Sequence, residues 1–242
     1  MGEIALEVKD LYITYNSMKT YSVKKNILKL KGSDKTRIEA VKGVSFALEK
    51  GKILGIVGKN GSGKSTMLKS IAGIFAPDSG SVDLHGHSIS LMSIGVGFNN
   101  ELSGRENIAL SGMLLGFSKE EIEKKTQEII EFSELGKFID APVRTYSSGM
   151  HSKLAFSITA ILETDIILVD EVLSVGDAKF KKKSYAKMKE LISDEDRTVV
   201  IVSHNMETLR SLCDIILWIN DGDMVMYGPK EEVLPKYEEY MS

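Results

Sequence analysis

Apolar residues along the chain follow two spacings, one typical of strands and one of helices. Residues 4–15 alternate apolar and polar side chains and are rich in β-branched and aromatic types, which predicts a strand. Short apolar runs of strand length predict further strands at residues 40–48, 52–58, 165–171, 197–203 and 214–219. The segment 220–228 carries the sequence NDGD followed by MVMYG, which predicts a hairpin at the edge of a sheet.

Helical spacing dominates the middle of the chain. Helices are predicted over residues 67–74, 103–116, 118–135 and 150–161, and a turn is predicted at 77–80. Ser118 with Glu121 three residues later forms a capping box at the start of the third of these helices. Apolar strands separated by helical segments in the second half predict a mostly parallel sheet covered on both faces.

Composition narrows the classes of function. The formal net charge of -3 at pH 7 argues against a nucleic-acid partner, because such proteins are usually strongly basic. The single cysteine, Cys213, precedes an apolar run and is interpreted as a small core residue. No apolar run reaches the ~20 residues that cross a bilayer, and no secretory signal begins the chain. We therefore expect a cytoplasmic protein that meets a membrane only through a partner.

A basic stretch separates the first two predicted strands. Residues 16–38 concentrate lysine and arginine, and the apolar residues among them, Val23, Ile27, Leu28 and Leu30, have a loose helical spacing. The simpler interpretation is a solvated insertion, because charge runs are usually exposed. The alternative is a basic lip that faces a membrane or a partner.

A glycine-rich loop follows the predicted strand at 52–58. Its sequence, GKNGSGKST, fits the phosphate-binding P-loop pattern between a strand and a helix. Glycines let backbone N–H groups surround the α- and β-phosphates without a Cβ in the way. Lys64 supplies charge at the β- and γ-phosphates, and the Ser65 hydroxyl is a Mg²⁺ ligand. The residues expected to bind ATP in this loop are Gly58, Asn60, Gly61, Ser62, Gly63, Lys64, Ser65 and Thr66.

Two acidic residues end the apolar strand at 165–171. Asp170 is expected to hold Mg²⁺ with Ser65, and Glu171 to polarise the water that attacks the γ-phosphate. His204 ends the next apolar strand. Because the carboxyl ends of parallel strands meet at one edge, we expect His204 near Glu171 and the γ-phosphate. Glu171 and His204 are therefore the predicted catalytic residues.

These motifs, in this order, resemble those of ABC-transporter ATP-binding subunits over nearly the whole chain. Residues 58–66 match Walker A, and IILVDE at 166–171 matches Walker B. The resemblance implies that SVGD, ending at Asp177, is the D-loop and that His204 is the switch histidine. It also implies that Tyr15 stacks on adenine.

The sequence YSSGM at 146–150 lies where this family carries its LSGGQ signature. The resemblance implies that Ser147, Ser148 and Gly149 contact ATP held by the P-loop of a second subunit. It implies a head-to-tail dimer with ATP and Mg²⁺ as ligands, in which each ATP is sandwiched between two copies. The signature therefore does not work alone.

The resemblance also implies an α/β fold of the P-loop NTPase type. This fold has a mostly parallel central sheet, an antiparallel β N-terminal portion and a helical subdomain. A single ABC ATPase domain is expected over residues 1–242. Residues 1–98 and 163–242 would form its RecA-like core, and 99–162 the helical subdomain that carries the signature.

Three positions depart from the common pattern. Ser148 replaces the first signature glycine, and Met150 replaces its glutamine. The Q-loop glutamine is replaced by Asn99 or Asn100. Asn is about 1.5 Å shorter, so we expect Asn99 to reach the nucleotide or Mg²⁺ through a bridging water or a shifted loop.

The segment GVGFNNELSGRENI and the YSSGM signature are similar to those of ATPases that export lipid-linked polysaccharides, the teichoic acid type being closest. We therefore expect a motor subunit on the cytoplasmic face of the plasma membrane that serves an integral membrane permease. The expected cargo is a polyprenyl-linked polysaccharide, wall teichoic acid before O-antigen or capsule. The permease would dock on the helices between Asn99 and Leu135. It would also select the cargo, because we expect no carbohydrate-binding domain in a chain that ends with LPKYEEYMS. The remaining alternatives are an importer ATPase and a non-transport ATPase that acts on DNA or ribosomes.

Overall fold

The computed structural model describes residues 2–17, 36–92, 97–170, 176–194 and 196–242. Most of the basic stretch, the predicted catalytic Glu171 and the first half of the predicted D-loop lie outside these ranges. No helix within the described ranges has the length and apolar character needed to span a bilayer.

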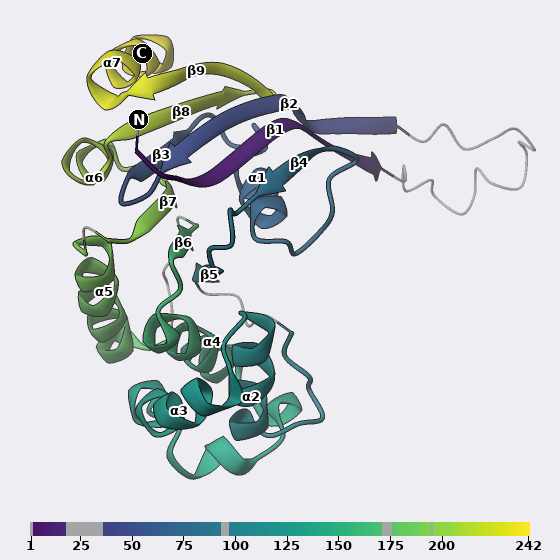
Figure 1. Ribbon diagram of the computed structural model, residues 1–242, viewed down its shortest axis with the longest axis vertical. Coiled ribbons are helices and arrows are strands. Elements are labelled where there is room, and N and C mark those ends of the chain that lie inside the picture. Colours follow the sequence, from purple (N-terminus) through teal and green to yellow (C-terminus); the bar gives the residue numbers. More distant parts are fainter. Residues whose placement is uncertain (1, 18–35, 93–96, 171–175, 195) are drawn as a thin grey trace, which may run out of the picture.

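A central sheet organises the fold (Figure 1). Within the described residues its strands, in spatial order, are β5 (Ile89–Met92), β6 (Ile166–Val169), β7 (Thr198–Val202), β3 (Ile53–Val57), β8 (Ile215–Asn220) and β9 (Asp223–Pro229). Neighbours pair in parallel up to β8, and β8 pairs antiparallel with β9 as the predicted edge hairpin. The fold class predicted from the sequence, a mostly parallel α/β sheet, is confirmed.

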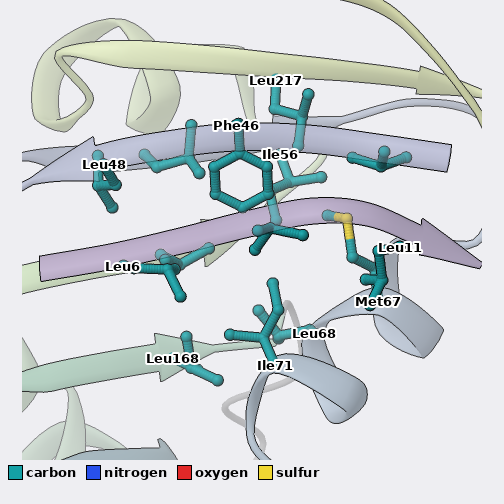
Figure 2. Close-up of a cluster of buried hydrophobic side chains, with 14 of the residues drawn as sticks. Leu6, Leu11, Phe46, Leu48, Ile56, Met67, Leu68, Ile71, Leu168 and Leu217 are labelled. Carbon is teal, nitrogen blue, oxygen red and sulfur yellow. The ribbon is translucent and has the colours of Figure 1, made fainter. Parts of the chain in front are cut away.

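A second, antiparallel sheet lies beside the central one. It has the order β2 (Thr36–Glu49), β1 (Ile4–Ser17) and β4 (Ser79–Asp83). Its apolar side chains, such as Leu6, Leu11 and Phe46, face Ile56 of β3 and Leu68 of α1 (Figure 2). The main core therefore lies between the two sheets and around α1.

The helices cover the sheets and form a separate lobe. They are α1 (Lys64–Ile71), α2 (Gly104–Leu114), α3 (Lys119–Ser133), α4 (Ser148–Leu162), α5 (Ala178–Ile192), α6 (Met206–Leu212) and α7 (Lys230–Met241), with short 3-10 helices at Gly136–Asp140 and Val143–Thr145. Helices α2, α3 and α4 pack around their own apolar cluster, which includes Ile108, Ile129 and Ile158. In Figure 1 this lobe lies at the end of the molecule opposite α7.

The strands of the sheet interior are apolar on both faces. In β6, Ile166 and Leu168 join the core beneath the antiparallel sheet. Ile167 and Val169 point to the other face, where they pack with Phe180 of α5. Successive side chains of a strand point to opposite faces, so a strand covered on both sides must be apolar throughout.

Local signals define several helix ends. The predicted capping box of Ser118 and Glu121 is confirmed, and Ser103 with Glu106 forms a second one at the start of α2. The Ser118 hydroxyl and backbone N–H donate to the Glu121 carboxylate and lower its pKa. Both boxes satisfy backbone donors that a helix N-terminus leaves unpaired.

The sequence prediction was wrong at several boundaries. The first helix begins at Lys64 rather than at residue 67, because the P-loop opens directly into it. The turn predicted at 77–80 overlaps β4, which begins at Ser79. Strand β4 is largely exposed and lacks an apolar alternation, so periodicity gives no sign of it. Strand β5 and helix α7 were not predicted either.

Cys213 is confirmed as a core residue. It is fully buried against Leu209 and Trp218, and burial raises the pKa of its thiol to about 12. Because thiolate is the reactive form, we expect the folded protein at pH 8 to react with a disulfide reagent about 10³-fold more slowly than the unfolded chain. Labelling with and without denaturant measures this difference. Equal rates would contradict the buried placement.

Candidate functional site: a cavity at the P-loop

Most P-loop residues, Tyr15 and His204 line one cavity at the carboxyl end of the central sheet. The cavity has a volume of about 590 Å³ and lies between the P-loop and the ends of β1 and β2. This volume is within the usual range for sites that bind small molecules. Its lining residues are Tyr15, Ile38, Glu39, Ala40, Lys42, Asn60, Gly61, Ser62, Gly63, Lys64, Ser65, Thr66, Val202, His204 and Asp221.

Two P-loop glycines have no room for a side chain. Gly63 has φ +100°, and a Cβ there would lie 2.0 Å from the carbonyl oxygen of Ala40. A Cβ on Gly58 would lie 2.1 Å from the carbonyl oxygen of Ile219. Gly61, in contrast, has φ +82°, and a Cβ at this position would have no atom of the described residues within 4 Å. The loop is thus held against β2 and β8 at Gly63 and Gly58, and is open at Gly61.

Lys64 is the first residue of α1 and extends back along the loop. Its side chain is buried, at 6% exposure, and Nζ donates to the carbonyl oxygens of Gly58 at 2.7 Å and Lys59 at 2.9 Å. A buried ammonium at a helix N-terminus suits the β- and γ-phosphates of a nucleotide. The role of Lys64 at the phosphates remains a prediction.

A hydroxyl and a carboxylate meet at the base of this cavity. The Ser65 hydroxyl donates to Asp170 Oδ1 at 3.2 Å, joining α1 to the end of β6. Oxygen donors of these two kinds suit Mg²⁺, so the residues present fit the metal that the resemblance implies. The Ser62 hydroxyl is buried and has no hydrogen-bond partner among the described residues, which leaves it available to a ligand.

Tyr15 borders the open side of the cavity. Its side chain is 44% exposed, and its hydroxyl donates to Thr66 Oγ1 at 3.3 Å. Ile38 is its partner in the β1–β2 register and also lines the cavity, although no pattern in the sequence indicates this role. An exposed aromatic ring with an apolar neighbour fits the face of a nucleobase.

His204 follows β7 and lines the same cavity as the P-loop. The prediction that it lies at the nucleotide edge of the sheet thus agrees with the geometry. Its predicted neighbour, Glu171, lies outside the described residues, whereas Asp170 lies within them. The catalytic roles of Glu171 and His204 remain predictions.

The signature begins helix α4 and does not line the P-loop cavity. Ser147 is the N-cap residue, and its hydroxyl accepts from the backbone N–H of Met150 at 3.2 Å. Ser148 is exposed, and among the described residues a Cβ on Gly149 would have only Ser147 Oγ and Gly176 Cα within 4 Å. As far as the described part of the chain shows, the helix N-terminus is open to an external anion.

The signature helix is connected to α5 by an ion pair that the sequence did not suggest. Lys153 Nζ donates to the Asp177 carboxylate at 2.6 Å, and Asp177 caps α5 by accepting from the N–H of Phe180. The Lys153 hydrogen bond and then the Phe180 N–H lower the pKa of Asp177 to about 2. Asp177 is thus ionised at neutral pH and keeps the end of the D-loop next to the signature.

Asn99, the predicted Q-loop residue, does not line the P-loop cavity. Its side-chain oxygen accepts from the backbone N–H of Glu101 at 3.0 Å, which forms a local turn. Its backbone is held by Asn107, a fully buried residue of α2 that bonds both the N–H and the carbonyl of Asn99. The proposed Mg²⁺ contact of Asn99 remains a prediction.

Phe98 connects this segment to the signature helix. Its ring centroid lies 4.7 Å from that of His151 in α4, and burial lowers the pKa of His151. Sequence reasoning missed Phe98, Asn107 and Lys153. Of these three residues, Asn107 alone carries a signal in the sequence, because it is a polar residue on the apolar side of a helix.

Comparison with known proteins agrees with this geometry. The family described as "ABC transporter" matches residues 41–174. The O-antigen export system ATP-binding protein RfbB of Myxococcus xanthus is 44% identical over 88% of this chain and 49% of its own length. The teichoic acids export ATP-binding protein TagH of Lactococcus lactis is 46% identical over 84% of this chain and 43% of its own length. The chain thus spans about half the length of these relatives, and an RfbB of Klebsiella pneumoniae is 42% identical over 84% of this chain and 82% of its own.

Solved structures share the fold. A dimeric ATP-binding cassette, MJ0796, bound to ADP and phosphate after hydrolysis, has a TM-score of 0.66 at 23% identity, covering 93% of this chain and 98% of that one. An ATP-binding subunit of an ABC transporter has a TM-score of 0.70 at 21% identity, and the match covers 97% of this chain and 93% of that one. The chain belongs to the ABC transporter family.

Proposed function

We propose that this cassette drives export of a polyprenyl-linked polysaccharide, with wall teichoic acid as the first candidate cargo. The observation that carries the proposal is 44–46% identity, over more than four-fifths of this chain, to ATP-binding proteins of O-antigen and teichoic acid export. The YSSGM signature is consistent with that assignment. An O-antigen exporter is the second candidate, because those relatives match equally well.

The P-loop cavity supports a phosphoryl-transfer site. Lys64 and the backbone N–H groups from Gly61 to Ser65 would bind and orient the phosphates, and Tyr15 with Ile38 would face the base. Ser65 and Asp170 would hold Mg²⁺, which neutralises charge that develops on the phosphate oxygens.

The remaining roles concern the attacking water. Glu171 would accept its proton, and His204 would hydrogen-bond the γ-phosphate oxygens and respond when that group leaves. The Thr66 hydroxyl and Asn60 complete the lining of the phosphate end of the cavity. Asn99 would act through a water or after a shift of its loop.

A second copy of the chain would complete the site. Ser147 and the N-terminus of α4 are open to an anion but lie outside the cavity of their own chain. In a head-to-tail dimer they would bind the γ-phosphate from the side opposite Lys64, with Ser148 and Gly149 allowing a close approach. ATP would then join the two copies, and hydrolysis would release them.

Replacing Ser147 by arginine tests this dimer. We expect ATP binding to the P-loop to be retained and hydrolysis to fall about 10²-fold, because a long side chain separates α4 from the partner's phosphate. Calorimetric binding and phosphate release measure the two effects. Ser193→Arg, at an exposed serine following α5, is the matched control. Full hydrolysis by the Ser147 variant would exclude the shared site.

The helical lobe offers a surface for the permease. A cavity of about 340 Å³ lies between α2 and α3, lined by Arg105, Ala109, Met113, Lys119, Ile122, Glu123 and Thr126. The neighbouring Leu114 is 57% exposed, and Met113 is 55% exposed. Exposed apolar side chains with a polar rim suit an amphipathic helix of a partner. We assign this surface to a cytoplasmic helix of the permease, which would keep the cassette at the inner face of the plasma membrane.

Residues 1–242 would form one ABC ATPase domain. The core would comprise 1–98 and 163–242, and the lobe 99–162 would carry the signature. The lobe has its own apolar cluster within α2, α3 and α4. It is also joined to the core, because Phe156 and Ala160 of α4 pack in one cluster with Ile167 of β6 and Phe180 of α5.

The decisive experiment is reconstitution of the chain with its permease in vesicles. Polyprenyl-linked teichoic acid, O-antigen and capsule precursors are supplied separately, and stimulation of ATP hydrolysis is measured. Greatest stimulation by the teichoic acid precursor supports the first candidate, and greatest stimulation by the O-antigen precursor supports the second. Stimulation by none of the three would exclude polysaccharide export.

A further inference from the structure

The P-loop has a contact on the side away from the nucleotide cavity. Nζ of Lys59, the second residue of the loop, lies 4.3 Å from the ring centroid of Tyr240 in the C-terminal helix α7. An ammonium at this distance from an aromatic face makes a favourable cation–π contact. Lys59 is not among the residues that line the cavity.

Tyr240 is held in place by its neighbours. Its hydroxyl donates to Asn220 Oδ1 at 3.2 Å, and its ring centroid lies 5.0 Å from that of Trp218. Trp218 pairs in register with Val57, the last residue of β3 before the P-loop. The ring that receives Lys59 is therefore fixed relative to the strand from which the loop begins.

Lys59 also organises the loop through its backbone. Its carbonyl oxygen accepts from Lys64 Nζ at 2.9 Å and from the N–H of Ser62 at 3.2 Å. The residue whose side chain contacts α7 thus contacts the phosphate-binding lysine through its main chain. Movement of Lys59 would change the shape of the phosphate cradle.

Helix α7 is well anchored beneath the loop. Val233, Leu234 and Tyr237 are buried in one cluster with Val57 and Trp218. An ion pair between Glu238 and Arg210 connects α7 to α6. His204 lines the nucleotide cavity and also a second cavity bordered by α7. The helix therefore lies against both the start of the P-loop and the predicted switch histidine.

We propose that α7 sets the nucleotide affinity of this cassette, with Tyr240 as the positioning residue that holds Lys59 and pre-organises the P-loop. Pre-organisation of a binding loop raises affinity because less conformational freedom is lost on binding. The coupling is reciprocal, so nucleotide binding strengthens the docking of α7 to the same extent. Any partner that displaces α7 would thereby weaken ATP binding.

A double-mutant cycle in the full chain tests this coupling. ATP and ADP dissociation constants are measured by calorimetry for Tyr240→Leu, Lys59→Met and the double variant. We expect each single change to weaken binding about two- to fivefold, the range for an exposed cation–π contact. The double variant should bind no more weakly than the weaker single variant, because both changes remove one contact.

Conservative and matched variants separate positioning from general stability. Lys59→Arg keeps a cation at the ring, so it should bind nearly as the parent chain does. Tyr240→Phe keeps the ring but loses the hydrogen bond to Asn220, so its affinity should lie between those of the parent and of Tyr240→Leu. Tyr185→Leu on α5, at a tyrosine that is 63% exposed, should have no effect on affinity. If Tyr240→Leu fails to fold, the proposal is tested by comparing the ATP and ADP dissociation constants of Lys59→Met with those of Lys59→Arg. Unchanged affinities, or losses that add in the double variant, would overturn the proposal.

Discussion

Replacing Lys64 by alanine is expected to lower ATP hydrolysis about 10²- to 10³-fold. The side chain is buried at the mouth of the P-loop, and its ammonium is held by the carbonyl oxygens of Gly58 and Lys59. In phosphoryl transfer, charge spreads over the phosphate oxygens, and a pre-oriented cation stabilises it more than mobile water does. Phosphate release at saturating ATP measures the effect on catalysis, and calorimetry measures the accompanying loss of affinity.

The matched control is Lys50→Ala, at an exposed lysine in the turn between β2 and β3. It removes the same charge from the chain but not from the cavity, so its hydrolysis should equal that of the parent protein. Thermal unfolding of both variants shows whether the fold is retained. Hydrolysis by the Lys64 variant above one-tenth of the parent rate would contradict its role at the phosphates.

Glu171→Gln is expected to reduce hydrolysis about 10²- to 10⁴-fold and to leave an ATP-bound dimer. The preceding residue, Asp170, already lies against Ser65 at the base of the P-loop, and the pair fits Mg²⁺. Glutamine keeps the shape of the side chain but cannot accept a proton from water. ATP would therefore bind and join two copies, but its slow hydrolysis would not release them.

Light scattering with ATP and with ADP measures this trapping. We expect a dimer with ATP and a monomer with ADP for the Glu171 variant, and rapid return to monomer for the parent chain. Glu120→Gln, at an exposed position in the first turn of α3, is the control and should behave as the parent. Normal turnover by the Glu171 variant would remove this residue from catalysis, and a monomer with ATP would contradict the shared site.

The sequence predicts a motif where the chemistry requires particular residue types at fixed positions in the chain. The P-loop needs glycines at positions where a Cβ would collide, as Gly58 and Gly63 show, and it needs Lys64 and Ser65 directly after them. Strands buried on both faces, such as β6, are apolar throughout and are recognised as such. These features depend on near neighbours in the chain.

Contacts between distant segments were not recoverable in this way. Lys153 is one of several lysines in the sequence, and only the packing of α4 beside α5 gives it Asp177 as a partner. Strand β4 is exposed and has no apolar pattern, so its existence depends on pairing with β1. Asn99 is predicted to replace the Q-loop glutamine, and its side chain is used in a local turn that the spacing did not predict.

The sequence by itself thus determined the family and the fold class, and it predicted the P-loop residues and the pairing of Ser65 with Asp170. It did so because these depend on the type and spacing of residues within one strand, loop and helix. Only the tertiary structure decided that the signature lies outside its own P-loop cavity, that Phe98 packs against His151 of α4, and that Tyr240 reaches Lys59. Those relations join residues far apart in the chain, and packing of the sheets and helices brings them together.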